Sequence, residues 1–236
     1  MAAASGVAVV IPTFNEAESI GAVVAALPRD IVDRVIVADG GSTDGTVGIA
    51  RHAGVEVIAA GSGYGRACLA GAQAADNAEI AVFMDGDGAD DAAAIKDMVA
   101  AIRTGGYDFV IGSRVRGQRE RGSMAGHQIL AGLAAGALIK LLYGVRYTDM
   151  CAYRAIRRDT LLALGMRELT YGWNLEMQMR VARAGLRVLE LPVAYHRRIG
   201  GRSKVAGNLR GSIKAGTRIV ATFARVAMEP SPARPA

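Results

Sequence analysis

Short apolar runs alternate with helix-like segments through the first half of the chain. The runs are 7–11, 34–38, 55–59, 80–84 and 109–111. Continuous apolar runs of this length are typical of parallel strands buried on both faces. The alternation therefore predicts an α/β fold with a mainly parallel sheet and helices on both of its faces.

Polar residues come just after several of these predicted strands. They are Asn15, Asp39, the glycine-rich stretch 61–65 and the pair Asp85 and Asp87. Ligands of open α/β sheets bind outside the carboxyl ends of the strands. We therefore expect these residues to converge on one crevice.

Capping residues give the expected starts of three helices in this half. We expect Asn15 to cap the helix that ends near Pro28, Ser42 or Thr43 to cap the next, and Asp90 or Asp91 to cap the helix that ends at Arg103. A further helix is expected over 66–75.

The second half is less regular. We expect helices at 123–143, 174–184 and 208–228 and strands at 148–155 and 187–191. The helix 208–228 is amphipathic and basic. Such a helix can lie on a membrane surface or pack on the core, and both interpretations stay open.

Cysteine content and hydropathy indicate the compartment. Cys68 and Cys151 are far apart, which suits a reducing cytoplasm. The most apolar later segment, 129–139, is 11 residues long because Lys140 ends it. A spanning helix needs about 20 apolar residues, so we expect no segment that crosses a bilayer.

Charge is unevenly distributed along the chain. Through Ser113 there are 6 Lys and Arg against 15 Asp and Glu, a net charge of −9; from Arg114 onward there are 22 against 7, a net charge of +15. An acidic half suits a divalent metal, and a basic half suits phosphates or an anionic membrane. Basic residues do not interleave with aromatic ones, so we expect no nucleic-acid partner.

Asp85 and Asp87 form the strongest local signal for chemistry. Two carboxylates separated by one residue, directly after a buried strand, can reach the same hard cation. Mg²⁺ or Mn²⁺ held in this way keeps open positions for substrate phosphates. A strand-ending turn is the alternative, but the nearby Asp90 and Asp91 favour a metal site.

Two other loops are candidates for ligand binding. Asp39 ends the second predicted strand, and its carboxylate could accept hydrogen bonds from a nucleotide base or ribose. The glycines of 61–65 are typical of a tight turn, and they form no complete phosphate-binding motif. Arg66, directly after them, could face the donor.

The order of motifs resembles inverting family-2 glycosyltransferases with the GT-A fold. The matching segments of the first half are VIPTFNE at 10–16, DGGS at 39–42, GYG at 63–65 and DGDG at 85–88. Those of the second half are similar to dolichol-phosphate mannose synthases and related polyprenyl-phosphate glycosyltransferases: GSR at 112–114, TD at 148–149, YR at 153–154, WNLEM at 173–177 and GGRSK at 200–204. The resemblance covers about 7–204.

The resemblance implies roles for particular residues. The nucleotide of a GDP- or UDP-sugar would contact Pro12, Phe14, Glu16 and Asp39. The metal and diphosphate would be held by Asp85 and Asp87. The acceptor phosphate or the donor diphosphate would meet Arg114, Arg202, Ser203 and Lys204, because arginine pairs with phosphate in two-pronged fashion. Of the histidines, His196 beside Arg197 and Arg198 could also help to bind phosphate.

Glu176 has two interpretations. It is either a general base or a structural partner of Arg180, four residues later on a predicted helix. An acceptor phosphate is already an anion and needs no strong base. Both roles therefore stay open from sequence alone.

The resulting hypothesis is a metal-dependent glycosyltransferase that works at the cytoplasmic face of a membrane. It has one GT-A domain over 1–228, with a nucleotide-sugar half at 1–113, an acceptor half at 114–205, an amphipathic helix at 206–228 and a disordered tail at 229–236. A nucleoside-diphosphate sugar is the donor, and a polyprenyl- or dolichyl-phosphate lipid is the acceptor. The alternatives are a transferase for a hydroxyl acceptor, a nucleotidyltransferase and a non-catalytic binding module.

Overall fold

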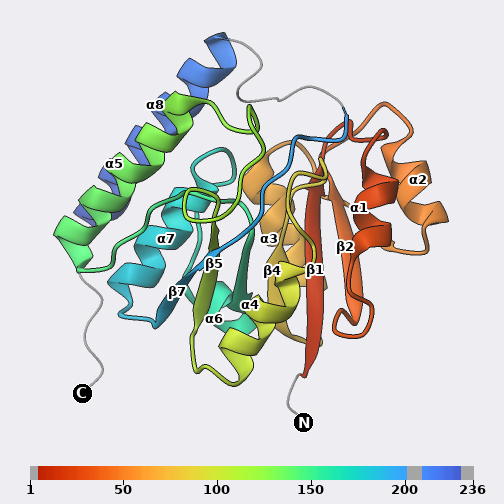
Figure 1. Cartoon of the computed structure of the whole chain (residues 1–236), viewed down its shortest axis with the longest axis horizontal. Coiled ribbons are helices and arrows are strands. Elements are labelled where there is room, and N and C mark those ends of the chain that lie inside the picture. Colours follow the sequence, from red (N-terminus) through yellow and green to blue (C-terminus); the bar gives the residue numbers. More distant parts are fainter. Residues whose placement is uncertain (1–4, 201–208, 230–236) are drawn as a thin grey trace.

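A seven-stranded sheet forms the centre of the molecule (Figure 1). The computed structural model describes residues 5–200 and 209–229, and it describes the side chains of the last helix from residue 216 onward. The strand order is β3-β2-β1-β4-β6-β5-β7. The strands are β1 (Gly6–Thr13), β2 (Arg34–Asp39), β3 (Glu56–Ala59), β4 (Ala78–Phe83), β5 (Phe109–Ser113), β6 (Arg154–Arg157) and β7 (Val188–Pro192).

The sheet is mainly parallel, as the strand–helix alternation predicts. Only β6 runs antiparallel to its neighbours β4 and β5 among the described strands. The central strand β1 is buried from Val7 to Ile11 because β2 and β4 flank it and helices cover it. This burial explains why the sequence of β1 is continuously apolar rather than alternating.

Helices cover both faces of the sheet. In Figure 1 α4 lies in front of it and α3 behind; α3 packs on β1 and β2, and α4 on β5 and β6. The helices are α1 (Ile20–Ala26), α2 (Thr46–His52), α3 (Tyr64–Ala74), α4 (Ala94–Arg103), α5 (Gly126–Tyr143), α6 (Arg158–Ala163), α7 (Trp173–Arg183) and α8 (Leu209–Met228).

The predicted caps of α1 and α2 are wrong. Asn15 has a left-handed φ of 55°, and α1 begins only at Ile20. The Asn15 side chain instead accepts a hydrogen bond from the Thr43 amide at 2.8 Å. Asparagine tolerates this backbone conformation and ties two loops together through its side chain. Gly45 precedes α2, so Ser42 and Thr43 are free to shape the loop before it.

The expected strand 148–155 is much shorter in the structure. The backbone enters the sheet only at Arg154. Before that point the amides of Thr148 and Asp149 donate to the Glu190 carboxylate on β7, at 2.7 and 3.2 Å. The segment is therefore held by a side chain rather than by a strand ladder.

The helix α8 packs on the domain through α7. Val226 is fully buried and Thr222 is 1% exposed, while Ile219 and Phe223 pack against the core. The core-packing interpretation of this amphipathic helix is therefore confirmed. Glu229, placed in a disordered tail by the sequence, instead pairs with Arg180 and Arg183; residues 230–236 lie outside the described part.

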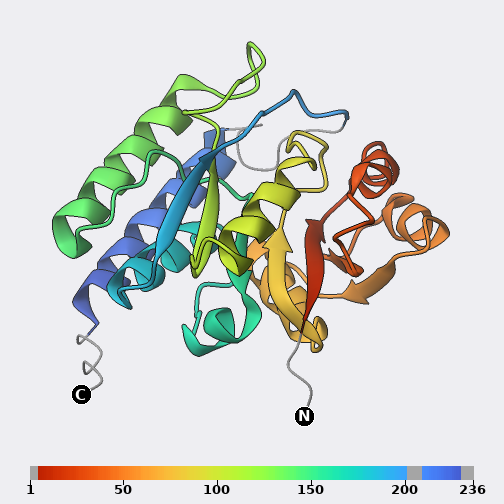
Figure 2. The ribbon, with the colours of Figure 1, turned by 60° about the horizontal axis from the view of Figure 1, so that its bottom comes forward.

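The apolar segment predicted at 129–139 belongs to a longer helix. The predicted helix 123–143 is confirmed: α5 runs over 18 residues from Gly126 to Tyr143 and continues past Lys140. By length and composition α5 is the one described helix apolar enough to cross a membrane. Figure 2 shows α5 at the edge of the molecule, away from β1 and β2.

Candidate active site

A set of loops gathers at the carboxyl ends of β1 and β4. The strand order reverses between these two strands, which is where open α/β sheets bind ligands. The Ser19 hydroxyl donates to the Gly86 carbonyl at 2.7 Å, and the Gly40 amide donates to the Thr13 carbonyl at 2.8 Å. A Cβ on Gly86 would lie 3.0 Å from Thr13, so the acidic loop packs closely on the end of β1.

Four aspartates lie on the loop that follows β4: Asp85, Asp87, Asp90 and Asp91. The Asp85 amide donates to the Asp90 carboxylate at 3.0 Å, which curls the loop around Asp87. Burial, and then the charge of Asp87, raises the pKa of Asp85 to about 7. Burial and the charge of Asp85 also raise the pKa of Asp90. The loop thus concentrates negative charge where water is scarce, an arrangement that favours a bound cation.

Arg198 supplies positive charge to this loop. Its Nη2 atom lies 2.8 Å from Asp87 Oδ2 and 4.0 Å from Glu16 Oε1. The chain after β7 brings it there: the amides of His196 and Ile199 donate to the carbonyls of Ala89 and Asp87, at 2.8 and 2.9 Å. Arg198 Nη1 is buried and has no hydrogen-bond partner among the described residues.

Only a weak signal for Arg198 is present in the sequence. It pointed to His196 beside two arginines, and it is Arg198 that reaches the acidic loop, whereas His196 pairs with Glu120 at 3.1 Å. Asp87 and Arg198 are 111 residues apart in the chain. Local patterns carry no information about such a contact.

Asp39 shapes the turn after β2. Its carboxylate accepts hydrogen bonds from the amides of Gly41 and Ser42, both at 2.9 Å, and from the hydroxyls of Ser42 and Thr13 at 2.5 and 3.4 Å. A carboxylate can accept about four hydrogen bonds, so these four donors occupy all of its acceptor positions. Asp39 is 6% exposed at the crevice, and its contact with a nucleotide stays a prediction.

The glycine-rich loop before α3 allows a close approach between two backbones. A Cβ on Gly63 would lie 2.5 Å from the Leu169 carbonyl oxygen, and one on Gly65 would lie 2.5 Å from that of Glu168. The Arg66 amide donates to Leu169 at 3.0 Å, and the Arg66 side chain is exposed. These glycines therefore serve packing, and the role of Arg66 at a donor stays a prediction.

Arg114 forms a two-pronged ion pair with Asp149. Its Nε and Nη2 atoms lie 2.8 and 2.7 Å from the Asp149 carboxylate, which also accepts from the Arg114 amide. The guanidinium lies over the ring of Tyr195, 5.0 Å from its centre. Arg114 thus fastens the end of β5 to the segment before β6.

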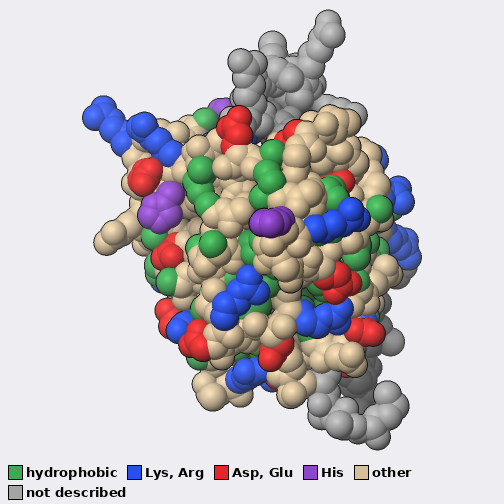
Figure 3. All heavy atoms as spheres, turned by 90° about the vertical axis from the view of Figure 1, so that its right-hand side faces the viewer, with side chains coloured by type: hydrophobic (Ala, Val, Ile, Leu, Met, Phe, Trp, Pro, Cys, Tyr) green, Lys and Arg blue, Asp and Glu red, His purple; other side chains and the backbone are tan. Residues whose placement is uncertain are grey.

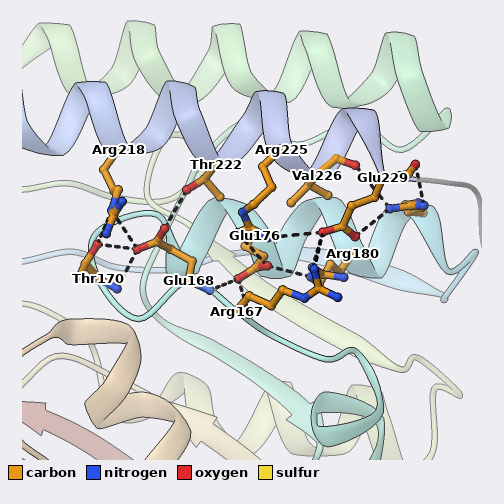
Figure 4. A network of polar contacts seen from close by, with 11 residues as sticks. Arg167, Glu168, Thr170, Glu176, Arg180, Arg218, Thr222, Arg225, Val226 and Glu229 are labelled. Carbon is orange, nitrogen blue, oxygen red and sulfur yellow. Dashed lines mark hydrogen bonds and ion pairs between the residues drawn. The ribbon is translucent and has the colours of Figure 1, made fainter.

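Glu176 is fully buried in a network that joins α7 to α8 (Figure 4). It accepts from the amides of Arg167 and Glu168 at 3.0 and 2.6 Å, and from the side chains of Arg180 and Arg225 at 2.9 and 3.0 Å. Burial alone would raise its pKa, but these donors outweigh it and hold the pKa below the usual value. The predicted Glu176–Arg180 pair is confirmed, and this bonding favours a structural role.

The remaining predicted residues fall into two groups. Pro12 and Glu16 lie near the acidic loop with side chains mostly covered, while Phe14 is 46% exposed beside the turn of Asp39. Arg202, Ser203 and Lys204 lie outside the described residues. In the described part of the chain, no three His, Cys, Asp or Glu side chains converge in a metal-binding arrangement.

Several related proteins align with most of this chain. An uncharacterized glycosyltransferase of Mycobacterium tuberculosis (strain ATCC 25618 / H37Rv) is 38% identical over 218 residues, which are 90% of this chain and 95% of that protein. The undecaprenyl-phosphate mannosyltransferase of Micrococcus luteus is 33% identical over 86% of this chain and 88% of its own length. The dolichyl-phosphate hexose transferase of Haloferax volcanii is 34% identical over 82% and 84%.

A solved structure and a family model complete the comparison. Glucosyl-3-phosphoglycerate synthase from Mycobacterium tuberculosis, in complex with Mn²⁺, uridine-diphosphate-glucose and phosphoglyceric acid, superposes with a TM-score of 0.74 at 23% identity. The match covers 96% of this chain and 81% of that one and shows that the fold is GT-A. The model of glycosyl transferase family 2 matches residues 8–165. The chain therefore belongs to glycosyl transferase family 2 and is a glycosyltransferase.

Proposed function

We propose that this enzyme transfers a sugar from a GDP- or UDP-sugar to a polyprenyl- or dolichyl-phosphate lipid, with inversion at the anomeric carbon. The observation that carries the proposal is the group formed by Asp85, Asp87 and Arg198 at the carboxyl ends of β1 and β4. It places anionic and cationic side chains where a diphosphate would lie. Two relatives whose names include a lipid phosphate support the acceptor class.

The acidic loop fits a divalent metal held partly by substrate. Two carboxylates on one loop suit Mg²⁺ or Mn²⁺, since these ions take their remaining ligands from phosphates and water. Burial and the charge of Asp87 raise the pKa of Asp85, and a bound cation would stabilise the ionised form of this carboxylate. When bound, the ion would neutralise the charge that builds on the departing diphosphate.

Arg198 and the residues after it are proposed to meet the phosphates. Arg198 Nη1 is buried with no partner among the described residues, and a phosphate oxygen would satisfy it. We place Arg202, Ser203 and Lys204 at the acceptor phosphate, because they follow Arg198 directly in the chain. Arg114 is assigned a positioning role, since Asp149 already holds its guanidinium.

The proposed acceptor requires no general base. A lipid phosphate is an anion at neutral pH, so its oxygen can attack the anomeric carbon without losing a proton. A hydroxyl acceptor would need a carboxylate that can accept a proton. Glu176 already accepts four hydrogen bonds and has a lowered pKa, which favours the phosphate acceptor over the hydroxyl alternative.

The proposal includes the place and organisation of the protein. A lipid acceptor would require work at a membrane surface, which we assign to the cytoplasmic face, where nucleotide sugars are the expected donors. We assign one GT-A domain to 1–228. The nucleotide would lie over residues 12–16 and 39, and the acceptor would lie between Arg114 and the segment that begins at Arg198.

A transfer assay tests the proposal. Labelled GDP- and UDP-sugars are incubated with the enzyme and Mg²⁺ or Mn²⁺, with and without a polyprenyl phosphate, and the label in the organic phase is counted. We expect label there only with both metal and lipid phosphate. The Asp87→Asn variant should lower kcat by about 10²- to 10³-fold.

Asp91→Asn is the matched control, because the Asp91 carboxylate accepts a hydrogen bond from the Ala93 amide at 3.0 Å and an asparagine oxygen can do the same. Its activity should stay close to that of the wild type. Equal losses in both variants, or transfer to a soluble sugar without any lipid, would contradict the proposal.

A further inference from the structure

The helix α5 exposes five leucines, and the face that it buries consists mainly of small residues. Gly132, Ala135, Gly136 and Ile139 face the protein. The exposed residues include Leu130 at 69%, Leu133 at 40%, Leu138 at 47%, Leu141 at 81% and Leu142 at 47%. A helix on the surface of a water-soluble protein normally shows the opposite pattern. The outer face of α5 is therefore built to contact something apolar.

The small residues hold α5 rigidly against the site. A Cβ on Gly136 would lie 1.9 Å from the Tyr147 carbonyl oxygen, and one on Gly132 would lie 3.5 Å from the Asp149 Cα. The helix also packs on α7. These contacts make α5 part of the folded domain, so we treat it as a surface helix and not as a membrane span. Its leucines are presented on the outside, next to the segment that pins Arg114.

Basic residues flank α5 in the sequence, and Lys140 lies on the helix itself. From Arg114 to Arg146 the sequence has 6 Lys and Arg and 1 Glu. Five of these cations are exposed: Arg116, Arg119, Arg121, Lys140 and Arg146. By contrast, the face formed by α1 and α2 mixes acidic, basic and hydrophobic side chains (Figure 3). Exposed leucines with exposed basic residues on and next to the same helix match the acyl chains and anionic headgroups of a lipid surface.

We propose that α5 docks the enzyme on an anionic bilayer, lying in the plane of the membrane with its leucines among the acyl chains. The inference rests on the proposed function, since the lipid acceptor would be drawn from the same membrane. A second copy of the chain fits the outer face of α5 less well than a bilayer does. In a two-fold dimer through α5 the same basic residues would face each other.

Vesicle flotation tests the inference. The wild-type enzyme should float with phosphatidylcholine vesicles that contain phosphatidylglycerol, and less with phosphatidylcholine alone. The double variant Leu130→Glu/Leu141→Glu changes the two most exposed leucines of α5 and should bind the anionic vesicles about 10- to 100-fold more weakly. Both side chains already face solvent, so the thermal unfolding temperature should not fall.

Leu162→Glu is the control, because Leu162 is an exposed leucine on α6, 37% exposed and away from α5. It should bind vesicles as the wild type does. Equal binding by the double variant would overturn the inference. So would a wild type that binds no vesicles and forms a dimer that the double variant loses, as measured by analytical ultracentrifugation.

Transfer to a polyprenyl phosphate in detergent separates this inference from the proposed function. If both hold, the double variant keeps its activity in detergent and loses it on vesicles. If the wild type transfers no sugar to any lipid phosphate but binds vesicles in a way that depends on the leucines of α5, the proposed function is wrong and the membrane-docking inference is supported.

Discussion

Replacing Glu176 by glutamine separates a structural role from a catalytic one. The substitution keeps the size of the side chain but places an amide group among four donors. One amide oxygen can still accept from the backbone of residues 167 and 168. The amide NH₂ would then point at the guanidinium groups of Arg180 and Arg225, which also only donate.

The cost follows from the burial of this network. Removing one partner of a buried ion pair costs about 3–5 kcal/mol. Arg180 is 12% exposed but Arg225 is 33% exposed, so water can compensate the second arginine in part. We therefore expect a loss near the lower limit, about 3 kcal/mol. For a domain of this size that loss lowers Tm by about 6–12 °C.

Thermal unfolding followed by circular dichroism, with kcat measured well below both transitions, provides the assay. We expect a lower Tm and a kcat close to that of the wild type. Glu56→Gln is the control, since Glu56 forms an exposed pair with Arg34 and should cost at most about 1 kcal/mol. An unchanged Tm with a kcat lowered by about 10²- to 10⁴-fold would identify Glu176 as a base and refute the reasoning.

Two further predictions concern the acidic loop. Arg198→Ala removes the cation that pairs with Asp87 at 2.8 Å. In the absence of nucleotide we therefore expect Mn²⁺ to bind about fivefold more tightly, the equivalent of about 1 kcal/mol. Titration calorimetry measures this affinity, and weaker binding would show that Arg198 does not compete with the metal. Because burial and Asp87 raise the pKa of Asp85 to about 7, metal binding below that pH must release a proton. Affinity for Mn²⁺ should therefore rise from pH 6 to pH 7 and then level, and an affinity independent of pH would contradict the assignment.

Local sequence patterns were enough to predict most of the fold. The apolar runs of β1, β2 and β4 and the helix around Glu176 lie within about two residues of their observed positions. They were predictable because a strand buried on both faces is a continuous apolar run, and because a helix packed on one face has apolar residues every three or four positions. The end-of-strand rule also predicted that Asp39 and the acidic loop lie at one edge of the sheet.

Contacts between distant segments could not be predicted in this way. Arg198 reaches Asp87 across 111 residues and Arg225 reaches Glu176 across 49. The sequence shows these arginines as ordinary charges, because only the folded chain decides which acid each one meets. The helix cap predicted at Asn15 is wrong for a related reason, since its left-handed backbone serves a loop contact instead.

The helix α5 shows a second limit. The predicted range 123–143 is close to the observed one, but the sequence did not show that the leucines would be exposed while Gly132 and Gly136 are buried. The orientation of that helix is set by Gly136, which allows contact with the backbone at Tyr147. A pattern of leucines and glycines alone does not say which side faces the protein.

The central claim is that the loop after β4 holds the cation and diphosphate of a sugar nucleotide. Crystals grown with Mn²⁺ and the nucleotide sugar found active in the transfer assay test it most directly, because manganese gives an anomalous signal that locates the ion. We predict an anomalous peak within ligand distance of an Asp85 or Asp87 oxygen, with the diphosphate against the same ion. A nucleotide bound elsewhere, or a diphosphate in this crevice with no manganese beside it, would contradict the account.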